Sequence, residues 1–232
     1  MKIEILYPEI CTLYGDKGNT MYLQKCLPDA EFVTTGLNEK PLFLKENIDM
    51  VYMCSMSEKS QELVLDRLMQ YKDEIAACMK DGKALFLLVG NSMELLGDYI
   101  KREDGTRVTG LGVVPGMYSV RQAPNRFNTL IKAKFNDMTL IGYTSRFAHT
   151  YGIPDDMTFC KVEIGQGSNP DTMNEGICKN RVIATYIQNP DFVHYLLEKL
   201  DAPMKEIPFE AAMRKAYDVK LAEYGKPDLE LS

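Results

Sequence analysis

Short apolar runs separated by polar segments set the pattern of the first hundred residues. Four of these runs predict strands: residues 2–7, 31–34, 49–53 and 84–89. Between them, a polar turn leads into a helix in one segment, and apolar side chains recur at helical spacing in another: residues 16–27 and 57–82. Uninterrupted apolar strands that alternate with helices are typical of a parallel sheet covered on both faces. The pattern therefore predicts an α/β fold.

The pattern changes after Gly97, where shorter extended pieces replace the long apolar runs. Asp104 and Gly105 form a turn signal between two such pieces, which is typical of a hairpin. Further along, the pattern predicts three strands and then two helices: residues 129–134, 138–143, 181–186, 191–200 and 209–224. No repeat, low-complexity tract or linker divides the chain. We therefore predict one domain over residues 1–205, followed by a C-terminal helix and tail over residues 206–232.

The composition is typical of a globular chain without a membrane span. Apolar residues make up 45% and charged residues 26% of the 232 residues, and no apolar run reaches the length of about 18 that crosses a bilayer. The N-terminal segment is predicted to be a strand rather than a signal peptide, so we expect a cytoplasmic protein. The net charge of −6 argues against nucleic acid as a partner.

The cysteines are too scattered to suggest a shared structural role. They form no CxxC pair and no cluster with either histidine: Cys11, Cys26, Cys54, Cys78, Cys160 and Cys178. We therefore expect no disulfide framework and no zinc site, and we predict neither a metal nor a cofactor.

The segment LFLLVGNSMELLG, residues 85–97, is the strongest functional signal in the chain. It predicts a buried strand that runs through a tight turn into a helix. In many hydrolases a nucleophile stands at the apex of such a turn. Here the apex is Gly90, which has no side chain.

Several short strings, taken in order, resemble the class I glutamine amidotransferase family of the cobyric acid synthase type. They are LYGDKGN at 13–19, the block 57–97 that ends in MELLG, DGTRVTGLGVV at 104–114, IGYTSRFAHTYG at 141–152 and ATYIQNP at 184–190. The resemblance implies a single flavodoxin-like α/β domain, whose mixed, mostly parallel sheet has helices on both faces. Within the family, the chain resembles the amidotransferase-like subunits of lipid II isoglutaminyl synthase. That similarity implies a Mur-ligase-like or other ATP-dependent ligase as partner, in cell-wall or cobalamin metabolism.

Members of this family hydrolyse glutamine with a cysteine at the apex of the turn and a histidine after a late strand. The thiolate attacks the amide, the histidine carries the proton, and backbone N–H groups hold the oxyanion. The resemblance places Gly90 at the cysteine position, Gln188 at the histidine position and residues 54–56 in the oxyanion segment. Glycine has no sulfur, and glutamine cannot accept and return a proton near neutral pH. The resemblance therefore implies a catalytically degenerate subunit with a binding or regulatory role and no catalytic residue.

Two alternatives remain open at this stage. An active ammonia-supplying subunit could use Cys54 or a residue of a partner. A following helix N-terminus can lower the pKa of the Cys54 thiol, although Cys54 is more simply a small residue at a strand end. A small-molecule sensor could instead hold glutamine or a related amino acid in the vacated pocket. We predict a ligand site built from these residues: Ser55, Gly90, Asn91, Arg146, His149 and Gln188.

Two further features have simple structural interpretations. His194 lies among apolar side chains of a predicted helix, which favours a structural role. The string YGDKGN, residues 14–19, opens a helix, and backbone N–H groups at such a place can bind an anion. A turn followed by a helix cap is the simpler explanation of this string, and we favour it.

Overall fold

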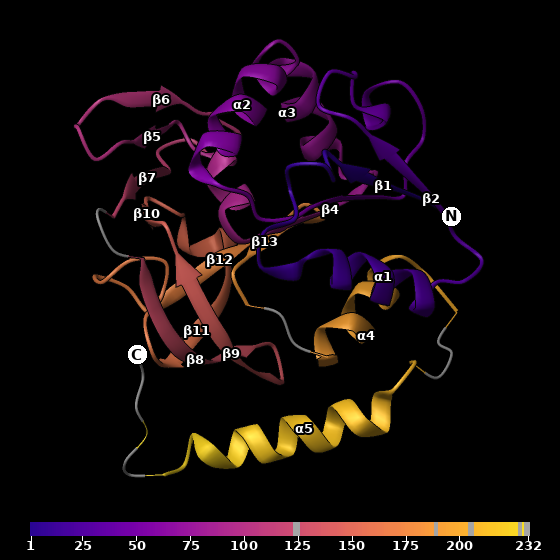
Figure 1. The fold of residues 1–232 in the computed structure, drawn as a ribbon, viewed down its shortest axis with the longest axis vertical. Coiled ribbons are helices and arrows are strands. Elements are labelled where there is room, and N and C mark those ends of the chain that lie inside the picture. The colour runs from indigo at the N-terminus through magenta and orange to yellow at the C-terminus, as the bar shows by residue number, and fades with distance from the viewer. Residues whose placement is uncertain (123–125, 188–189, 204–206, 227–228, 230–232) are drawn as a thin grey trace.

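A nine-stranded mixed sheet forms the centre of the molecule (Figure 1). The computed structural model describes residues 1–122, 126–187, 190–203, 207–226 and 229. One half of the sheet is parallel and runs in the order β2 (Glu31–Thr35), β1 (Lys2–Leu6), β3 (Met50–Met53), β4 (Leu85–Val89) and β13 (Val182–Thr185). The other half is antiparallel and continues with β12 (Asn174–Lys179), β11 (Thr158–Ile164), β8 (Phe127–Phe135) and β9 (Met138–Arg146).

The predicted α/β fold with a mixed sheet is confirmed, but the antiparallel share is larger than the expected mostly parallel sheet. The strands of the first half return through helices, which permits parallel pairing. In the second half, strands that follow one another in the chain pair directly. The β8–β9 hairpin is the clearest case, because Asn136 in its two-residue turn takes the left-handed conformation that such turns require, with φ 50°.

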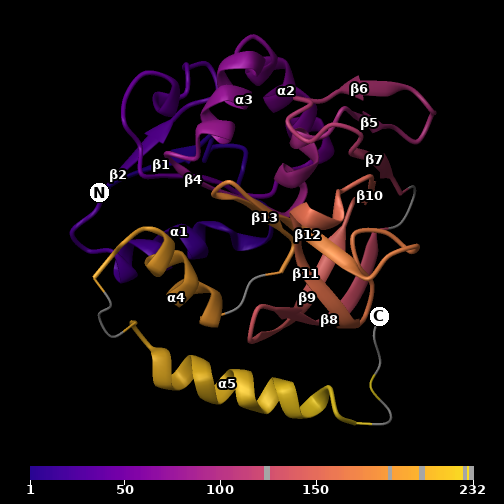
Figure 2. The same ribbon diagram turned by 180° about the vertical axis from the view of Figure 1, so that it is seen from behind.

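Helices cover both faces of the sheet, as predicted (Figures 1 and 2). They are α1 (Lys17–Cys26) and α4 (Pro190–Lys199) on one face, and α2 (Glu58–Met69) and α3 (Lys72–Asp81) on the other. The single helix predicted over residues 57–82 is wrong, since the chain leaves the helical conformation at Tyr71, where φ is −115°. Leu68 of α2 and Ile75 of α3, on either side of the break, are both buried in the core.

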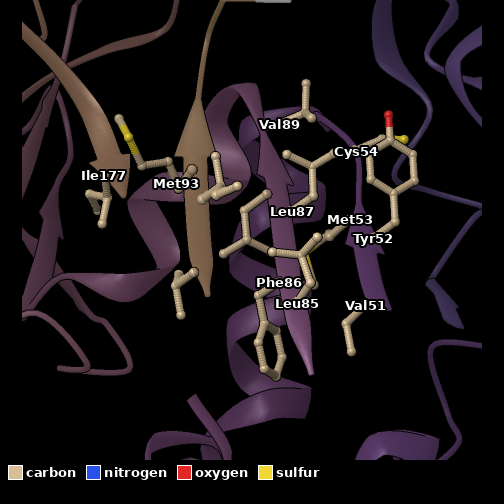
Figure 3. Packing of buried hydrophobic residues seen from close by; sticks show 14 of the residues in the cluster. Val51, Tyr52, Met53, Cys54, Leu85, Phe86, Leu87, Val89, Met93 and Ile177 are labelled. Atoms are coloured by element: carbon tan, nitrogen blue, oxygen red, sulfur yellow. The ribbon is translucent and has the colours of Figure 1, made fainter. Parts of the chain in front are cut away.

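Strand β4 carries the centre of the core. Each of its residues is at most 5% exposed, because the strand is covered on both faces (Figure 3). This burial explains why the strand is an uninterrupted apolar run in the sequence. Beyond the sheet, none of the helices in the described ranges is both long and apolar enough to cross a bilayer.

A second, four-stranded sheet lies beside α2 and was not predicted as a unit. Its strand order is β10 (Ala148–Tyr151), β7 (Tyr118–Arg121), β5 (Tyr99–Lys101) and β6 (Arg107–Thr109). The hairpin signal at Asp104 and Gly105 is confirmed, since β5 and β6 are antiparallel neighbours that this turn connects. Glu62 of α2 ties this sheet to the helix, because it accepts hydrogen bonds from Arg102 at 2.8 Å and from Arg121 at 2.7 Å.

These contacts predict a pH-dependent contribution to stability. The hydrogen bonds from Arg102 and Arg121 lower the pKa of Glu62 to about 2. A carboxylate whose pKa is lower in the folded state stabilises the fold above its unfolded pKa, and that contribution disappears as the pH falls toward the folded value. We expect Glu62→Gln to destabilise the protein clearly at pH 7 and much less near pH 2, as measured by urea unfolding. A difference that stays constant over this range would contradict the assignment.

The last helix, α5 (Glu210–Glu223), lies on the surface, and none of its residues is buried. Its Tyr217 hydroxyl donates to the Thr139 carbonyl of β9 at 2.7 Å, and Glu210 lies 3.0 Å from the His194 Nε2 of α4. The structural role expected for His194 fits this contact between two helices. A domain boundary near residue 205 stays a prediction.

Candidate functional site

The turn after β4 has the backbone shape that a nucleophile elbow requires. Gly90 follows the strand directly and has φ +63°, in the left-handed region that favours glycine. The chain then continues as the 3-10 helix η3 (Gly90–Leu96) rather than as the predicted α-helix. The turn lies at the carboxyl end of the parallel strands, where open α/β sheets bind their ligands.

Ser55, which follows β3, fills the space beside this apex. A Cβ atom placed on Gly90 would lie 2.8 Å from the Ser55 Cβ atom, closer than real Cβ contacts allow. A side chain at position 90 therefore has no room while Ser55 keeps its place.

The Asn91 side chain forms hydrogen bonds with the backbone of Met56, the residue after Ser55. Its Oδ1 accepts from the Met56 N–H at 2.9 Å, and its Nδ2 donates to the Met56 carbonyl at 2.7 Å. Asn91 is completely buried. The Met56 N–H lies in the segment that the family resemblance assigns to the oxyanion site, and here a side chain of the same protein engages it.

Asp16 adds a buried carboxylate to the site. The Ser55 N–H donates to Asp16 Oδ2 at 2.9 Å, and the Ser55 hydroxyl donates to the same oxygen. Burial raises the pKa of Asp16, and the hydrogen bonds from Ser55 oppose that rise. Asp16 stands at the N-cap position of α1 but caps no backbone N–H, so the capping interpretation of residues 14–19 is wrong.

These residues line one cavity of about 460 Å³, within the range of small-molecule sites. Besides Asp16, Ser55, Gly90 and Asn91, its lining residues are Gly15, Asn19, Val89, Tyr143, Ser145, Phe147 and Tyr186. Three of the six predicted ligand-site residues thus come together. Sequence reasoning missed Asp16 and the aromatic residues, although the aspartate of YGDKGN, at the end of a predicted strand–turn unit, carried a usable signal.

Two of the remaining predicted ligand residues, Arg146 and His149, do not line this cavity. Arg146 is completely buried behind Tyr186, with its Cζ 4.3 Å from the ring centroid, and it pairs with Glu175 at 3.2 Å. His149 contacts Gln166 at 3.3 Å, and burial lowers its pKa. Gln188 lies outside the described residues.

Hydrogen bonds between buried side chains stabilise the residues around the site. Glu94 is completely buried and accepts from the Tyr186 hydroxyl at 2.7 Å and from Gln61 Nε2 at 2.8 Å. Gln61 also donates to the Asn91 carbonyl at 2.9 Å, which connects α2 to the elbow. Burial raises the pKa of Glu94, and the hydrogen bonds from Gln61 and Tyr186 oppose that rise.

Cys54 does not have the properties of a nucleophile. Burial raises the pKa of its thiol to about 12, so the expected lowering by a helix N-terminus is wrong. The side chain lies beside Tyr52 (Figure 3), and Cys54 does not line the cavity. Among the described residues, neither a thiol nor an imidazole lines the cavity.

Solved structures share this fold. One glutamine amidotransferase structure matches with a TM-score of 0.56 at 11% identity, covering 86% of this chain and 99% of that chain. A glutamine amidotransferase from Thermotoga maritima matches with a TM-score of 0.51 at 12% identity, covering 94% of this chain and 85% of that chain. At these identities the likeness shows the fold alone.

Sequence relatives extend the comparison. The lipid II isoglutaminyl synthase (glutamine-hydrolyzing) subunit GatD of Streptococcus pneumoniae is 26% identical over 194 residues, which cover 82% of this chain and 74% of the relative. The subunit of the same name from Staphylococcus aureus is 26% identical over 207 residues, which cover 85% and 83%. The profile of the CobB/CobQ-like glutamine amidotransferase domain matches residues 2–190. The chain therefore belongs to the CobB/CobQ-like glutamine amidotransferase family.

Proposed function

We propose that this chain is an amidotransferase-like subunit that binds a ligand or a partner and does not hydrolyse glutamine by cysteine–histidine chemistry. The single observation that carries the proposal is that side chains of the chain itself fill the space at the turn after β4, an arrangement we call the occupied elbow. Ser55 stands 2.8 Å from where a Cβ of residue 90 would be, and the Asn91 side chain engages the Met56 N–H.

The three changes at the elbow fit one another physically. Glycine at position 90 makes room for the Ser55 side chain, and Ser55 in turn donates to the Asp16 carboxylate. Asn91 satisfies both backbone groups of Met56. A site that had merely lost its nucleophile would keep the empty space and the free N–H, whereas here side chains of the chain itself occupy both. This mutual fit supports a site maintained for a purpose other than thiolate attack.

We further propose an ATP-dependent ligase as partner, of the Mur-ligase-like kind. The two relatives are by name subunits of lipid II isoglutaminyl synthase, which supports a cell-wall role. Such a partner would place the chain in the cytoplasm. The retained cavity of about 460 Å³ supports ligand binding beside partner binding, with Ser55, Gly90 and Asn91 as proposed contacts.

Glutamate release from glutamine tests this proposal. The purified chain is assayed alone and together with a Mur-ligase-like protein from the same organism, with a glutamine-hydrolysing relative as positive control. We expect no release above that of the heat-denatured sample. Clear turnover would overturn the proposal, and its loss in Cys54→Ala would then assign the activity to that thiol.

A further inference from the structure

The cavity holds one acidic group that no cation neutralises. Asp16 is 6% exposed, and the donors that reach its carboxylate are the Ser55 N–H, the Ser55 hydroxyl and, at 3.3 Å, Asn19 Nδ2. All three donors are uncharged. Among the described residues, no lysine, arginine or histidine forms an ion pair with Asp16. A buried carboxylate in this state is stabilised by a cation that enters the cavity.

Aromatic side chains make up much of the remaining wall. Tyr143, Phe147 and Tyr186 all line the cavity. One face of two of these rings is already occupied by a guanidinium, since Arg126 Cζ lies 4.0 Å from the Phe147 centroid and Arg146 Cζ lies 4.3 Å from the Tyr186 centroid, so a cation in the cavity would use Tyr143 or the opposite ring faces. Aromatic rings attract ammonium groups as they attract guanidinium groups. The wall is therefore suited to an organic cation.

The same lining is poorly suited to a carboxylate. No basic side chain among the described residues lines the cavity. Arg146 lies behind Tyr186 and is paired with Glu175, and the Met56 N–H is engaged by Asn91. An α-amino acid would bring a carboxylate beside Asp16 without a cation to receive it, and like charges at close range repel. This charge balance disfavours the amino-acid sensor considered from the sequence.

We propose that the cavity binds a small organic ammonium compound that carries no carboxylate, with Asp16 as its counter-ion. Tyr143, Phe147 and Tyr186 would surround the aliphatic part, and Asn19 lies in the same wall, where its amide can hydrogen-bond a polar end. The inference rests on the proposed binding function, because a working glutaminase site would hold glutamine itself.

Isothermal titration calorimetry with three matched probe compounds tests which charged groups of a ligand the cavity accepts. 4-Aminobutanamide carries the ammonium and the amide, L-glutamine adds the α-carboxylate to the same skeleton, and butanamide lacks both charges. We expect 4-aminobutanamide to bind at least about tenfold more tightly than either of the other two. Added salt should weaken its binding less than it weakens an exposed ion pair, because the contact is buried.

Two variants complete the test. Asp16→Asn keeps the acceptor for Ser55 and removes the charge, so it should fold and lose about tenfold or more in affinity for 4-aminobutanamide. Asp218→Asn makes the same change on an exposed position of α5 and should bind as the unmodified chain does. If Asp16→Asn fails to fold, the comparison of the three probes on the unmodified chain still decides the question.

The outcomes are distinct. Preference for 4-aminobutanamide that depends on Asp16 supports the proposal. L-Glutamine binding as tightly as 4-aminobutanamide, butanamide binding equally, or no binding of any probe up to about 10 mM would overturn it. The glutamate-release assay is independent of these titrations, so absence of turnover together with absence of amine binding rejects the ammonium site and leaves the proposed function standing.

Discussion

Replacing Glu175 by leucine is expected to destabilise the fold by about 3–5 kcal/mol, because it leaves a buried guanidinium without its counter-charge. Arg146 and Glu175 are both completely buried, and their side chains lie 3.2 Å apart. Glu175 also accepts from the Thr185 hydroxyl at 2.8 Å and from the Tyr186 N–H at 3.0 Å. With the Cys160 thiol, which donates to Glu175 at 3.7 Å, one substitution removes the partner of a charge and three further hydrogen bonds.

An exposed ion pair provides the matched control. Glu74 pairs with Lys40 at 2.7 Å, but their side chains are 50% and 30% exposed. Glu74→Leu should cost less than about 1 kcal/mol, since water compensates for the lost contact. Urea unfolding of the two variants measures the difference. Equal and small losses would show that Arg146 finds another partner when Glu175 is removed, contrary to the prediction.

The Glu175 contacts also bear on the cavity. Tyr186 separates Arg146 from the cavity, and its backbone N–H is held by Glu175. Without Glu175 as acceptor, Tyr186 and the cavity wall that follows β13 would no longer be held in place. The buried ion pair thus helps to keep the guanidinium away from ligands, which is consistent with a cavity that receives cations.

The parallel half of the fold could be predicted from the sequence because its strands are covered on both faces. Their burial leaves uninterrupted apolar runs, as in residues 85–89, and the alternating helices imply parallel pairing. The small sheet lacked such a signal, since β6 has three residues and none of them is buried. Its position depends on contacts such as Glu62 with Arg121, which are 59 residues apart in the chain.

The site was predicted only in part for a related reason. Gly90 and Asn91 were found because the strand–turn–helix pattern is local. Asp16 was missed because its partner Ser55 lies 39 residues away, and the two meet only when β1 and β3 pair as neighbours. Arg146 was placed in the site because residue type alone does not reveal that Tyr186 and Glu175 already surround it.

Restoring a cysteine at the apex tests whether Ser55 and Gly90 depend on each other. Gly90→Cys is expected to destabilise the chain by about 3 kcal/mol, from the left-handed backbone and from the contact with Ser55 together. Gly105→Cys is the control, because Gly105 also has positive φ, at +86°, but nothing lies within 4 Å of its Cβ position. This control should lose only about 1–2 kcal/mol, the cost of the backbone conformation.

The double variant Ser55→Gly with Gly90→Cys removes the contact and completes a double-mutant cycle. Ser55→Gly alone loses the hydroxyl that donates to Asp16, so it destabilises the fold on its own. If the two positions compete for one space, the double variant loses about 1–3 kcal/mol less stability than the two single variants lose together. Additive losses would mean that the space beside Gly90 adapts without Ser55 moving, and the occupied elbow would then no longer explain the missing nucleophile. The double variant should still release no glutamate, because the family resemblance places Gln188 at the histidine position, and a carboxamide cannot carry the proton.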